Sequence, residues 1–570
     1  MRSGIRAGSS GATGPVQADY THSLMVQVTA EFSKARALVI DGSPMSRAIL
    51  VSQVRDFGFE KVVQCTRLAE ARDYFTESSF DVVLCEHYFA NESPTGLDFV
   101  DELRGKQLLP LSTVVFMVTG ESSYARVAEA AEAALDGYLL KPHKANQLHE
   151  RLRLACYRKE SFREVYNHID SHQFDVAAEI CLERYHQRGL FWLYAARIGA
   201  ELLMRIERFK EAQELYEAIA AANTLPWAKL GVARALMESG NAVEAANALG
   251  ALLEEDPNYA DAYDVLARAQ FELGDVDQAR ATYKMACNMT PDSVGRVQAL
   301  GMMTYYAGDM QEAAELLDRA ARIGLDSKMF DCQTLVALAF TQLDLKDHRG
   351  LQRCRDNFTR LLERNPGSLR HERGVAIIDA LLALMKNETA RLLGMVREMT
   401  TAARQPGFDF EAGSNLMALL TRTALRELRV NEAERHVDEL AMRFCTSRPI
   451  TDILAGAATA HAPYADRVRK AGHQVQKIAQ NAVTLAMMGD PSLAVRQLTV
   501  EGANTLNSKL IDAAHHIVQR YQEKISDHAF LSAKVQELRN QYGARSRTQV
   551  PASSGRQPGG LALRMDSGTG

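Results

Sequence analysis

Residues 80–85 read FDVVLC and residues 113–118 read TVVFMV, two continuous apolar runs rich in β-branched side chains. Three shorter runs accompany them, and helical patterns lie between the runs: ARALVI at 35–40, KVVQ at 61–64 and GYLL at 137–140. Strands that are apolar throughout, rather than on alternate residues, are typical of a parallel sheet covered on both faces. The pattern therefore predicts a doubly wound α/β domain with five parallel strands.

We place this domain at residues 34–158. Right-handed crossovers between parallel strands leave few topologies open to it, and together with the strand-end residues described below they predict the strand order 2-1-3-4-5. Functional residues are then expected at the carboxyl ends of the strands. Residues 1–33, which open with Gly, Ser, Ala and Thr, are predicted to be disordered.

After residue 160 the strand pattern ends and a repeat begins. GNAVEA, GDVDQA and GDMQEA end at Ala245, Ala279 and Ala313, which are spaced by 34 residues, and Leu or Tyr follows each alanine by four. Ala177 and Ala212 extend the series upstream at spacings of 35 and 33. A period near 34 with Gly at the turn and a small residue after it resembles the tetratricopeptide repeat, a hairpin of two helices.

The repeats divide the rest of the chain into three predicted segments. Residues 160–325 carry the clear register, and residues 326–540 keep the composition while the register decays, so we predict degenerate helical repeats there. Residues 541–570, which include SRTQVPASSGRQPGG, are predicted to be a disordered tail. The overall fold class is thus an α/β domain followed by an all-α solenoid.

Composition excludes several classes of function. The chain has 66 Lys and Arg against 71 Asp and Glu, a net charge of −5, which gives no overall footprint for nucleic acid. Its 8 cysteines include no CxxC pair, which argues against a zinc ribbon or a disulfide framework. No apolar run approaches the roughly 18 residues that a membrane span needs. We therefore expect a cytoplasmic protein with no membrane insertion.

Polar residues stand at the predicted strand ends in a recognisable order. VIDGSPMSR supplies Asp41, FDVVLCE supplies Glu86, VFMVTGE supplies Thr119, and GYLLKP supplies Tyr138 and Lys141. In order, spacing and context the segment resembles the receiver domain of bacterial response regulators. The resemblance makes Asp41 the acidic-pocket residue, Glu86 the equivalent of the phosphoacceptor, and Thr119, Tyr138 and Lys141 the switch and phosphate-site equivalents.

Two departures from the receiver pattern affect its chemistry. Gly42 stands where the family has a second acid, and Glu86 stands where it has Asp, so a Mg²⁺ site is weakened and we predict no cofactor. Glu86 reaches farther than Asp, and its carboxylate is expected to extend toward Lys141 and Thr119 in imitation of an acyl phosphate. The alternative is that Glu86 is a salt-bridged remnant without signalling value.

The resemblances imply a function in two-component signalling rather than in catalysis. The leading hypothesis is a non-enzymatic adaptor whose degenerate receiver docks a histidine kinase or another two-component protein, while the repeats present a groove to a protein partner. The alternative is a phosphorylation-competent response regulator of a phosphorelay that has the repeats as its output. A catalytic site hidden in residues 326–540 has no motif in its favour.

Overall fold

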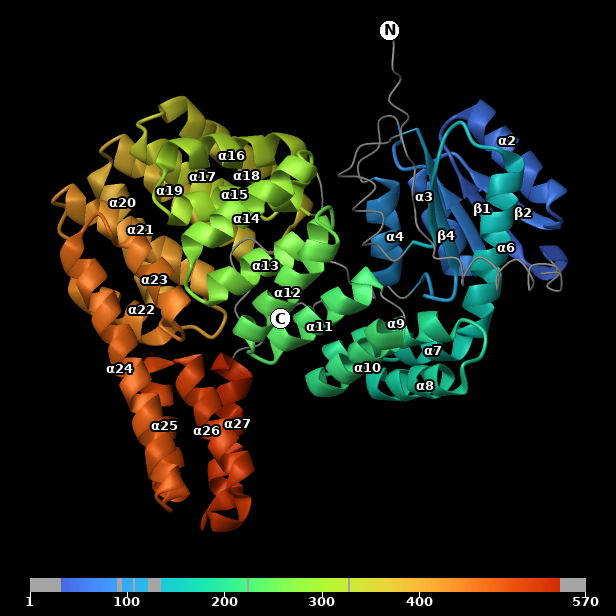
Figure 1. The fold of residues 1–570 in the computed structure, drawn as a ribbon. Helices are drawn as coiled ribbons and strands as arrows, with labels where there is room; N and C mark the ends of the chain where they lie inside the picture. Colours follow the sequence, from blue (N-terminus) through green and yellow to red (C-terminus); the bar gives the residue numbers. More distant parts are fainter. Residues whose placement is uncertain are drawn as a thin grey trace, which may run out of the picture. The chain divides into compact units, whose positions relative to one another are not determined.

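The computed structural model describes residues 32–89, 95–105, 108–120, 135–222, 225–326 and 329–543. Among these residues the chain forms two compact units, one ending at Leu202 and the other beginning at Leu203 (Figure 1). The predictions of disorder for the two tails fall almost entirely outside the described residues.

The first unit contains a five-stranded parallel sheet in the order β2-β1-β3-β4-β5, as predicted. All five strands are short, and each of them matches one of the five runs of the sequence to within two residues at each end. Their bounds are β1 (Arg36–Ile40), β2 (Lys61–Cys65), β3 (Val82–Cys85), β4 (Val114–Thr119) and β5 (Gly137–Leu140).

Helices cover both faces of this sheet (Figure 1). α2 (Pro44–Asp56) and α6 (Ala145–Ser161) pack on one face, and α3 (Leu68–Glu77) and α4 (Gly96–Gly105) pack on the other. Successive strand residues alternate between the two cores, so that Val39 packs toward α2 while Ile40 packs toward α3. This double burial explains why the interior strands are almost entirely apolar, while β2 at the edge of the sheet carries Lys61 and Gln64.

The first unit continues from α6 directly into helices. Phe162, which is fully buried, joins α6 to α7 (Arg163–Asp170). α8 (Phe174–Gln187) and α9 (Trp192–Arg205) follow, and α7 packs against α8.

The second unit opens with hairpins whose register follows the predicted repeat. The helix after each turn carries the signature alanine as its fourth residue, and Ala212, Ala245, Ala279 and Ala313 are all fully buried. The alanine helices are α10 (Phe209–Ala222), α12 (Ala242–Glu255), α14 (Val276–Met289) and α16 (Met310–Gly324); α11 (Pro226–Glu238), α13 (Ala260–Glu272) and α15 (Val294–Tyr306) pack between them.

Hairpins continue beyond residue 326 with different residues in the same places. In α18 and α20 the fourth position is held by Leu351 and Leu392, both buried, in place of alanine. The positive-φ turn residue is Lys346 or Asn387, where three earlier hairpins have Gly240, Gly274 and Gly308. The helices are α17 (Gln333–Asp344), α18 (His348–Arg364), α19 (Leu369–Met385), α20 (Thr389–Ala402), α21 (Phe410–Leu425) and α22 (Ala433–Phe444). The sequence register of the repeat is lost here because leucine occupies the buried helix position that holds alanine in the earlier hairpins.

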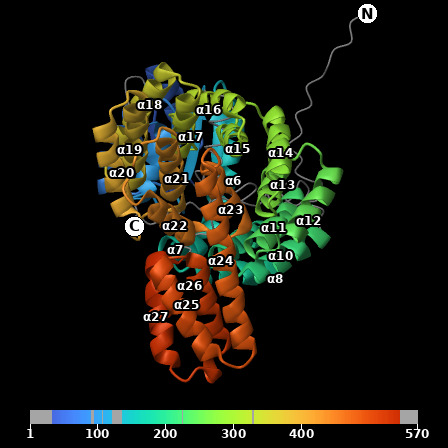
Figure 2. The same cartoon turned by 90° about the vertical axis from the view of Figure 1, so that its left-hand side faces the viewer.

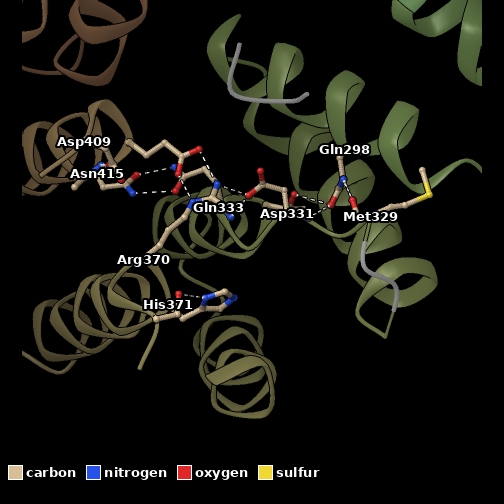
Figure 3. Close-up of polar contacts among 12 residues, drawn as sticks. Gln298, Met329, Asp331, Gln333, Arg370, His371, Asp409 and Asn415 are labelled. Carbon is tan, nitrogen blue, oxygen red and sulfur yellow. Dashed lines mark hydrogen bonds and ion pairs between the residues drawn. The ribbon is translucent and has the colours of Figure 1, made fainter. Parts of the chain in front are cut away.

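The inner helices of these hairpins are buried on nearly all sides. All residues from Thr334 to Leu343 in α17 are buried, and α23 (Arg448–Ala457) returns to pack against α15. Polar contacts fasten α17 to α19 and α21: Gln333 and Asn415 exchange amide hydrogen bonds of 2.8 and 3.0 Å (Figure 3). Within α17–α21 the inner face is therefore occupied by protein side chains rather than open as a groove.

Arg370 of α19 completes this set of polar contacts. Its guanidinium binds both carboxylate oxygens of Glu411, at 2.7 and 2.8 Å, and lies 2.6 Å from Asp331, while Asp331 accepts the backbone N–H of Gln333 (Figure 3). One arginine thus joins the starts of three successive inner helices.

The last helices form a bundle with its own core (Figure 2). They are α24 (Ala462–Met487), α25 (Pro491–Thr505), α26 (Ser508–Arg520), the 3-10 helix η2 (Gln522–Lys524) and α27 (His528–Tyr542). α24 is 26 residues long, longer than the helices of the earlier hairpins. The turn after it nevertheless keeps the repeat signature, because Gly489 has a positive φ and the buried Ala494 is the fourth residue of α25. Among the described helices, none is long and apolar enough to cross a membrane.

Candidate functional site

The carboxyl end of the sheet brings together residues that are far apart in the sequence. Asp41 follows β1, Glu86 follows β3, and Lys141 follows β5. Backbone hydrogen bonds hold two of them to neighbouring strands: the N–H of Glu86 donates to Ile40, and the N–H of Lys141 donates to Thr119. The backbone hydrogen bonds of the sheet therefore set the positions of these residues independently of their side-chain contacts.

Lys141 forms ion pairs with both carboxylates. Its Nζ lies 2.6 Å from Oε2 of Glu86 and 2.8 Å from Oδ2 of Asp41. The side chain of Asp41 is 1% exposed, that of Glu86 14% and that of Lys141 23%. At such burial, water screens the charges less than on the open surface, so the three side chains form one electrostatic unit.

Asp41 is held by the beginning of α2 as well. Its Oδ1 accepts the backbone N–H of Ser43 at 2.8 Å, and its Oδ2 accepts the hydroxyl of Ser46 at 2.6 Å. Arg47 donates to the carbonyl oxygen of Asp41 at 2.6 Å. Ser46 and Arg47 were not among the site residues predicted from the sequence. Their position in the first turn of the helix that follows Asp41 could have indicated that they contact it.

Glu86 divides its two oxygens between backbone and side chain. Oε1 accepts the backbone N–H of His87 at 2.6 Å, while Oε2 binds Lys141. Gly96 packs directly behind it: a Cβ at that position would stand 2.0 Å from the carbonyl oxygen of Glu86, which excludes any side chain. The backbone around Glu86 is thus closely constrained.

Thr119 and Tyr138 lie on the two neighbouring strands. Thr119, 2% exposed, is the last residue of β4, and Tyr138 is half-buried in β5 against the core beneath α3 and α4. Tyr138 pairs in register with Met117, two residues before Thr119. Thr119 therefore stands at the carboxyl end of the sheet, as predicted, whereas Tyr138 is the second residue of β5 and lies two residues before the end of that strand.

Protonation of the site follows from these contacts. Burial by itself would lower the pKa of Lys141, but the hydrogen bonds and negative charges of Asp41 and Glu86 outweigh it and raise this pKa above 10.5. Burial, together with the nearby Lys141, lowers the pKa of His143. Lys141 is accordingly a cation at neutral pH.

Comparison with known proteins identifies this part of the chain. Residues 37–153 match the response regulator receiver domain family, and residues 236–301 match the tetratricopeptide repeat family. Chemotaxis protein CheY of Pseudomonas aeruginosa is 27% identical over 117 residues, which cover 20% of this chain and 92% of that protein. CheY-3 of Vibrio cholerae is also 27% identical over 117 residues, covering 88% of its length. Residues 37–153 form a receiver domain.

Two solved structures of receiver proteins are similar to part of the chain. A response regulator receiver domain protein from Clostridium thermocellum is 24% identical and has a TM-score of 0.21, covering 22% of this chain and 98% of that one. Chemotaxis protein CheY4 of Vibrio cholerae is 25% identical and has a TM-score of 0.20, covering 21% and 98%.

The receiver family implies a Mg²⁺ ion at this site, and the residues present do not fit one. Both oxygens of Asp41 already accept hydrogen bonds, Glu86 is bound to His87 N–H and Lys141, and Gly42 offers no oxygen from a side chain. Among the described residues, no group of three or more His, Cys, Asp or Glu side chains is arranged to hold a metal ion. A cation between the two carboxylates would have to displace the Lys141 ammonium.

Gly42 is nevertheless a position where a side chain fits. A Cβ built there meets a ring carbon of Phe89 at 3.6 Å and the carbonyl oxygen of Thr66 at 3.7 Å, both ordinary van der Waals distances. The second acid of the receiver pattern is therefore missing from the sequence without being excluded by the surrounding backbone.

Proposed function

We propose that this chain is a cytoplasmic, non-enzymatic adaptor of two-component signalling. In this proposal its receiver is degenerate and needs no phosphoryl group or metal ion, because Glu86 supplies a permanent negative charge at the phosphoacceptor position. The helical repeats bind a protein partner, and the receiver docks a histidine kinase or another two-component protein.

One observation carries the proposal: the Lys141 ammonium lies 2.6 Å from Glu86 and 2.8 Å from Asp41. In a phosphorylated receiver the strand-end lysine faces an acyl phosphate, a group that carries more than one negative charge near neutral pH. Here the side chain of Glu86, which is one methylene longer than that of Asp, already places its carboxylate against the same lysine. The receiver is thereby held in a single charge state that does not depend on a kinase.

The burial of the repeats supports one assignment of where the partner binds. The inner faces of α17 and α21 are filled by protein, so we assign partner binding to the outer surfaces of those hairpins or to the repeats before residue 325. Receiver domains and tetratricopeptide repeats both serve protein recognition, which supports a scaffold with two docking surfaces.

The proposal is tested with the full chain as bait in quantitative affinity capture. Glu86→Gln keeps the shape of the side chain and removes its charge, and Lys141→Ala removes the ammonium. Capture of the receiver-dependent partners by both variants is expected to fall by about 5- to 150-fold in affinity, the usual range of coupling between sites. Lys144→Ala, which removes an exposed lysine nearby, is the matched control and is expected to bind like the wild type.

Phosphorylation chemistry separates the adaptor from a phosphorylation-competent regulator. Incubation of the wild-type chain with acetyl phosphate and Mg²⁺ is expected to add no phosphoryl group by intact mass. Uptake of a phosphoryl group in an acyl linkage, which both acid and base hydrolyse, would contradict the proposal. So would unchanged partner capture in both Glu86→Gln and Lys141→Ala, which would make the strand-end residues a relic.

A further inference from the structure

A second buried charge cluster lies at the opposite end of β5 from the candidate site. Asp136 immediately precedes this four-residue strand, and Lys141 immediately follows it. β5 is the last strand in the sheet order and pairs with β4. Both ends of one short strand are therefore tied to ionised side chains.

The carboxylate of Asp136 joins a strand to a helix. Its Oδ2 accepts the backbone N–H of Val115 in β4 at 3.0 Å and lies 3.4 Å from Nζ of Lys159. Its Oδ1 accepts Nη2 of Arg158 at 3.2 Å. The side chains of Asp136 and Lys159 are 4% and 7% exposed, so this ion pair is shielded from water.

The two cations of the cluster extend its contacts to the helices after the receiver. The Arg158 guanidinium lies 4.8 Å from the ring centre of Tyr194 in α9, and Lys159 Nζ lies 4.5 Å from that of Tyr166 in α7. The two tyrosine hydroxyls are 3.0 Å apart. One connected set of contacts thus runs from β5 to α7 and α9 inside the first unit.

A backbone contact reinforces the same connection. Leu111, just before β4, receives a hydrogen bond on its carbonyl oxygen from Lys159 Nζ, and its N–H donates to Oδ2 of Asp170 at the end of α7 at 3.1 Å. The amino-terminal edge of the sheet is therefore fastened to α7 from two sides.

We propose that the cluster of Asp136, Arg158 and Lys159 couples the ion pairs of Lys141 to the position of α7 and α9. This inference rests on the proposed function of the site and assigns the route by which it reaches the helical repeats. An edge strand with one neighbour shifts more easily than an interior strand, and β5 has ion pairs at both ends. Loss of the Lys141 ion pairs is expected to displace β5 and weaken the contacts of Asp136, because buried charge pairs depend strongly on distance.

Hydrogen–deuterium exchange of the full chain tests this coupling. Glu86→Gln is expected to raise exchange of the amides in α7 and α9 at least about fivefold, the lower end of typical coupling between sites. In the Asp136→Asn background, Glu86→Gln is expected to change exchange near Asp41 but to add nothing in α7 and α9. Exchange in α18 serves as an internal reference in the second unit.

Asp81 provides the matched control. It immediately precedes β3 as Asp136 precedes β5, and it too accepts a backbone N–H of a neighbouring strand, that of Arg36 at 2.8 Å. Asp81→Asn is expected to leave the effect of Glu86→Gln on α7 and α9 intact. If Asp136→Asn fails to fold by circular dichroism, Tyr194→Phe replaces it, because that variant removes only the hydroxyl contact between α9 and α7.

The outcomes separate this inference from the proposed function. An equal rise of exchange in α7 and α9 with and without Asp136, or no rise in the wild-type background, would overturn the coupling. Loss of partner capture in Glu86→Gln without any change in α7 and α9 would leave the proposed function standing and overturn the inference. A rise of exchange in α7 and α9 in Glu86→Gln that depends on Asp136, together with unchanged partner capture, would support the coupling and contradict the proposed function.

Discussion

Two lysines of the first unit show how burial and partners set the charge of a side chain. Lys141 has two carboxylates within 2.8 Å, which raise its pKa above 10.5 against the effect of burial. Lys159 is more deeply buried, and burial lowers its pKa to about 8 although Asp136 partly opposes the shift. The contributions of Lys141 and Lys159 to the free energy of unfolding therefore change in opposite directions with pH.

The first prediction concerns Lys159. Its folded pKa of about 8 lies below the ordinary 10.5, so between these pH values the unfolded chain binds more protons than the folded chain. This group therefore makes the free energy of unfolding rise from pH 8 to 10.5, by on the order of 1–3 kcal/mol. Lys141, whose folded pKa is raised, contributes stability that is fully present below pH 10.5 and is lost above it.

Urea denaturation of Lys159→Met and wild type across this pH range is the measurement. Trp192 is in the first unit, so its fluorescence in a Trp227→Phe background reports on that unit. The rise of stability with pH is expected to be smaller in Lys159→Met and unchanged in Lys144→Met. A slope equal to that of the wild type in Lys159→Met would disprove the assignment.

The second prediction restores the acids of the receiver pattern. Gly42 has room for a Cβ, so Gly42→Asp combined with Glu86→Asp is expected to fold and to place three carboxylates at the strand ends. Oxygen ligands then become available for a hard cation. The double variant is expected to gain Mg²⁺-dependent phosphoryl uptake from acetyl phosphate, measured by intact mass, while Gly42→Ala with Glu86→Asp gains none.

At the scale of the element, the repeats depend on small residues where two helices approach closely. Ala279 is fully buried in α14, and Ala281 in the same helix is exposed. Ala279→Leu is expected to overpack the hairpin and lower the free energy of unfolding by about 1–3 kcal/mol. Ala281→Leu has the same change of volume and is expected to have little effect. Equal stabilities of the two variants in urea denaturation would refute the register.

Glycine turns provide a second prediction at this scale. Gly274 has φ +88°, and a Cβ there meets nothing within 4 Å, so only backbone strain opposes a side chain. Gly274→Ala is expected to destabilise the chain by about 1 kcal/mol, the usual magnitude for a left-handed residue. Gly250 lies inside α12, also with free space at its Cβ, and Gly250→Ala is expected to stabilise by about 0.5–1 kcal/mol. Thermal denaturation that moves both variants in one direction would contradict this reasoning.

At the scale of the whole molecule, each unit has its own hydrophobic core. Leu38 is fully buried in the sheet, and Leu419 is fully buried in α21 within the core of the second unit. Chains with separate cores seldom unfold in one step. Calorimetry is therefore expected to resolve more than one transition. Leu38→Ala should lower one of them and Leu419→Ala another, each by the equivalent of about 2–5 kcal/mol; a single transition shifted by both variants would argue against independent units.

The sequence alone was sufficient for the sheet and the regular repeats. The continuous apolar runs predicted five parallel strands, because a sheet covered on both faces requires mostly apolar residues. The strand-end residues and right-handed crossovers predicted the observed order. The 34-residue spacing predicted buried alanines as far as Ala313. The spacing did not identify the hairpins of α18 and α20, because other residue types stand at the equivalent positions. Leu351 and Leu392 replace the buried alanine, and Lys346 and Asn387 replace the turn glycine.

Which residues stand at the strand ends was also determined by the sequence, since the carboxyl ends of parallel strands meet at one edge. Only the tertiary structure decided how they interact: that one ammonium bridges Glu86 and Asp41, and that Ser46 holds Asp41. It also decided that α17 and α21 fill the inner face of the repeats, and that Asp136 reaches α6. These contacts join residues between 5 and 100 positions apart, and their geometry depends on how whole elements pack, which no local pattern of residues specifies.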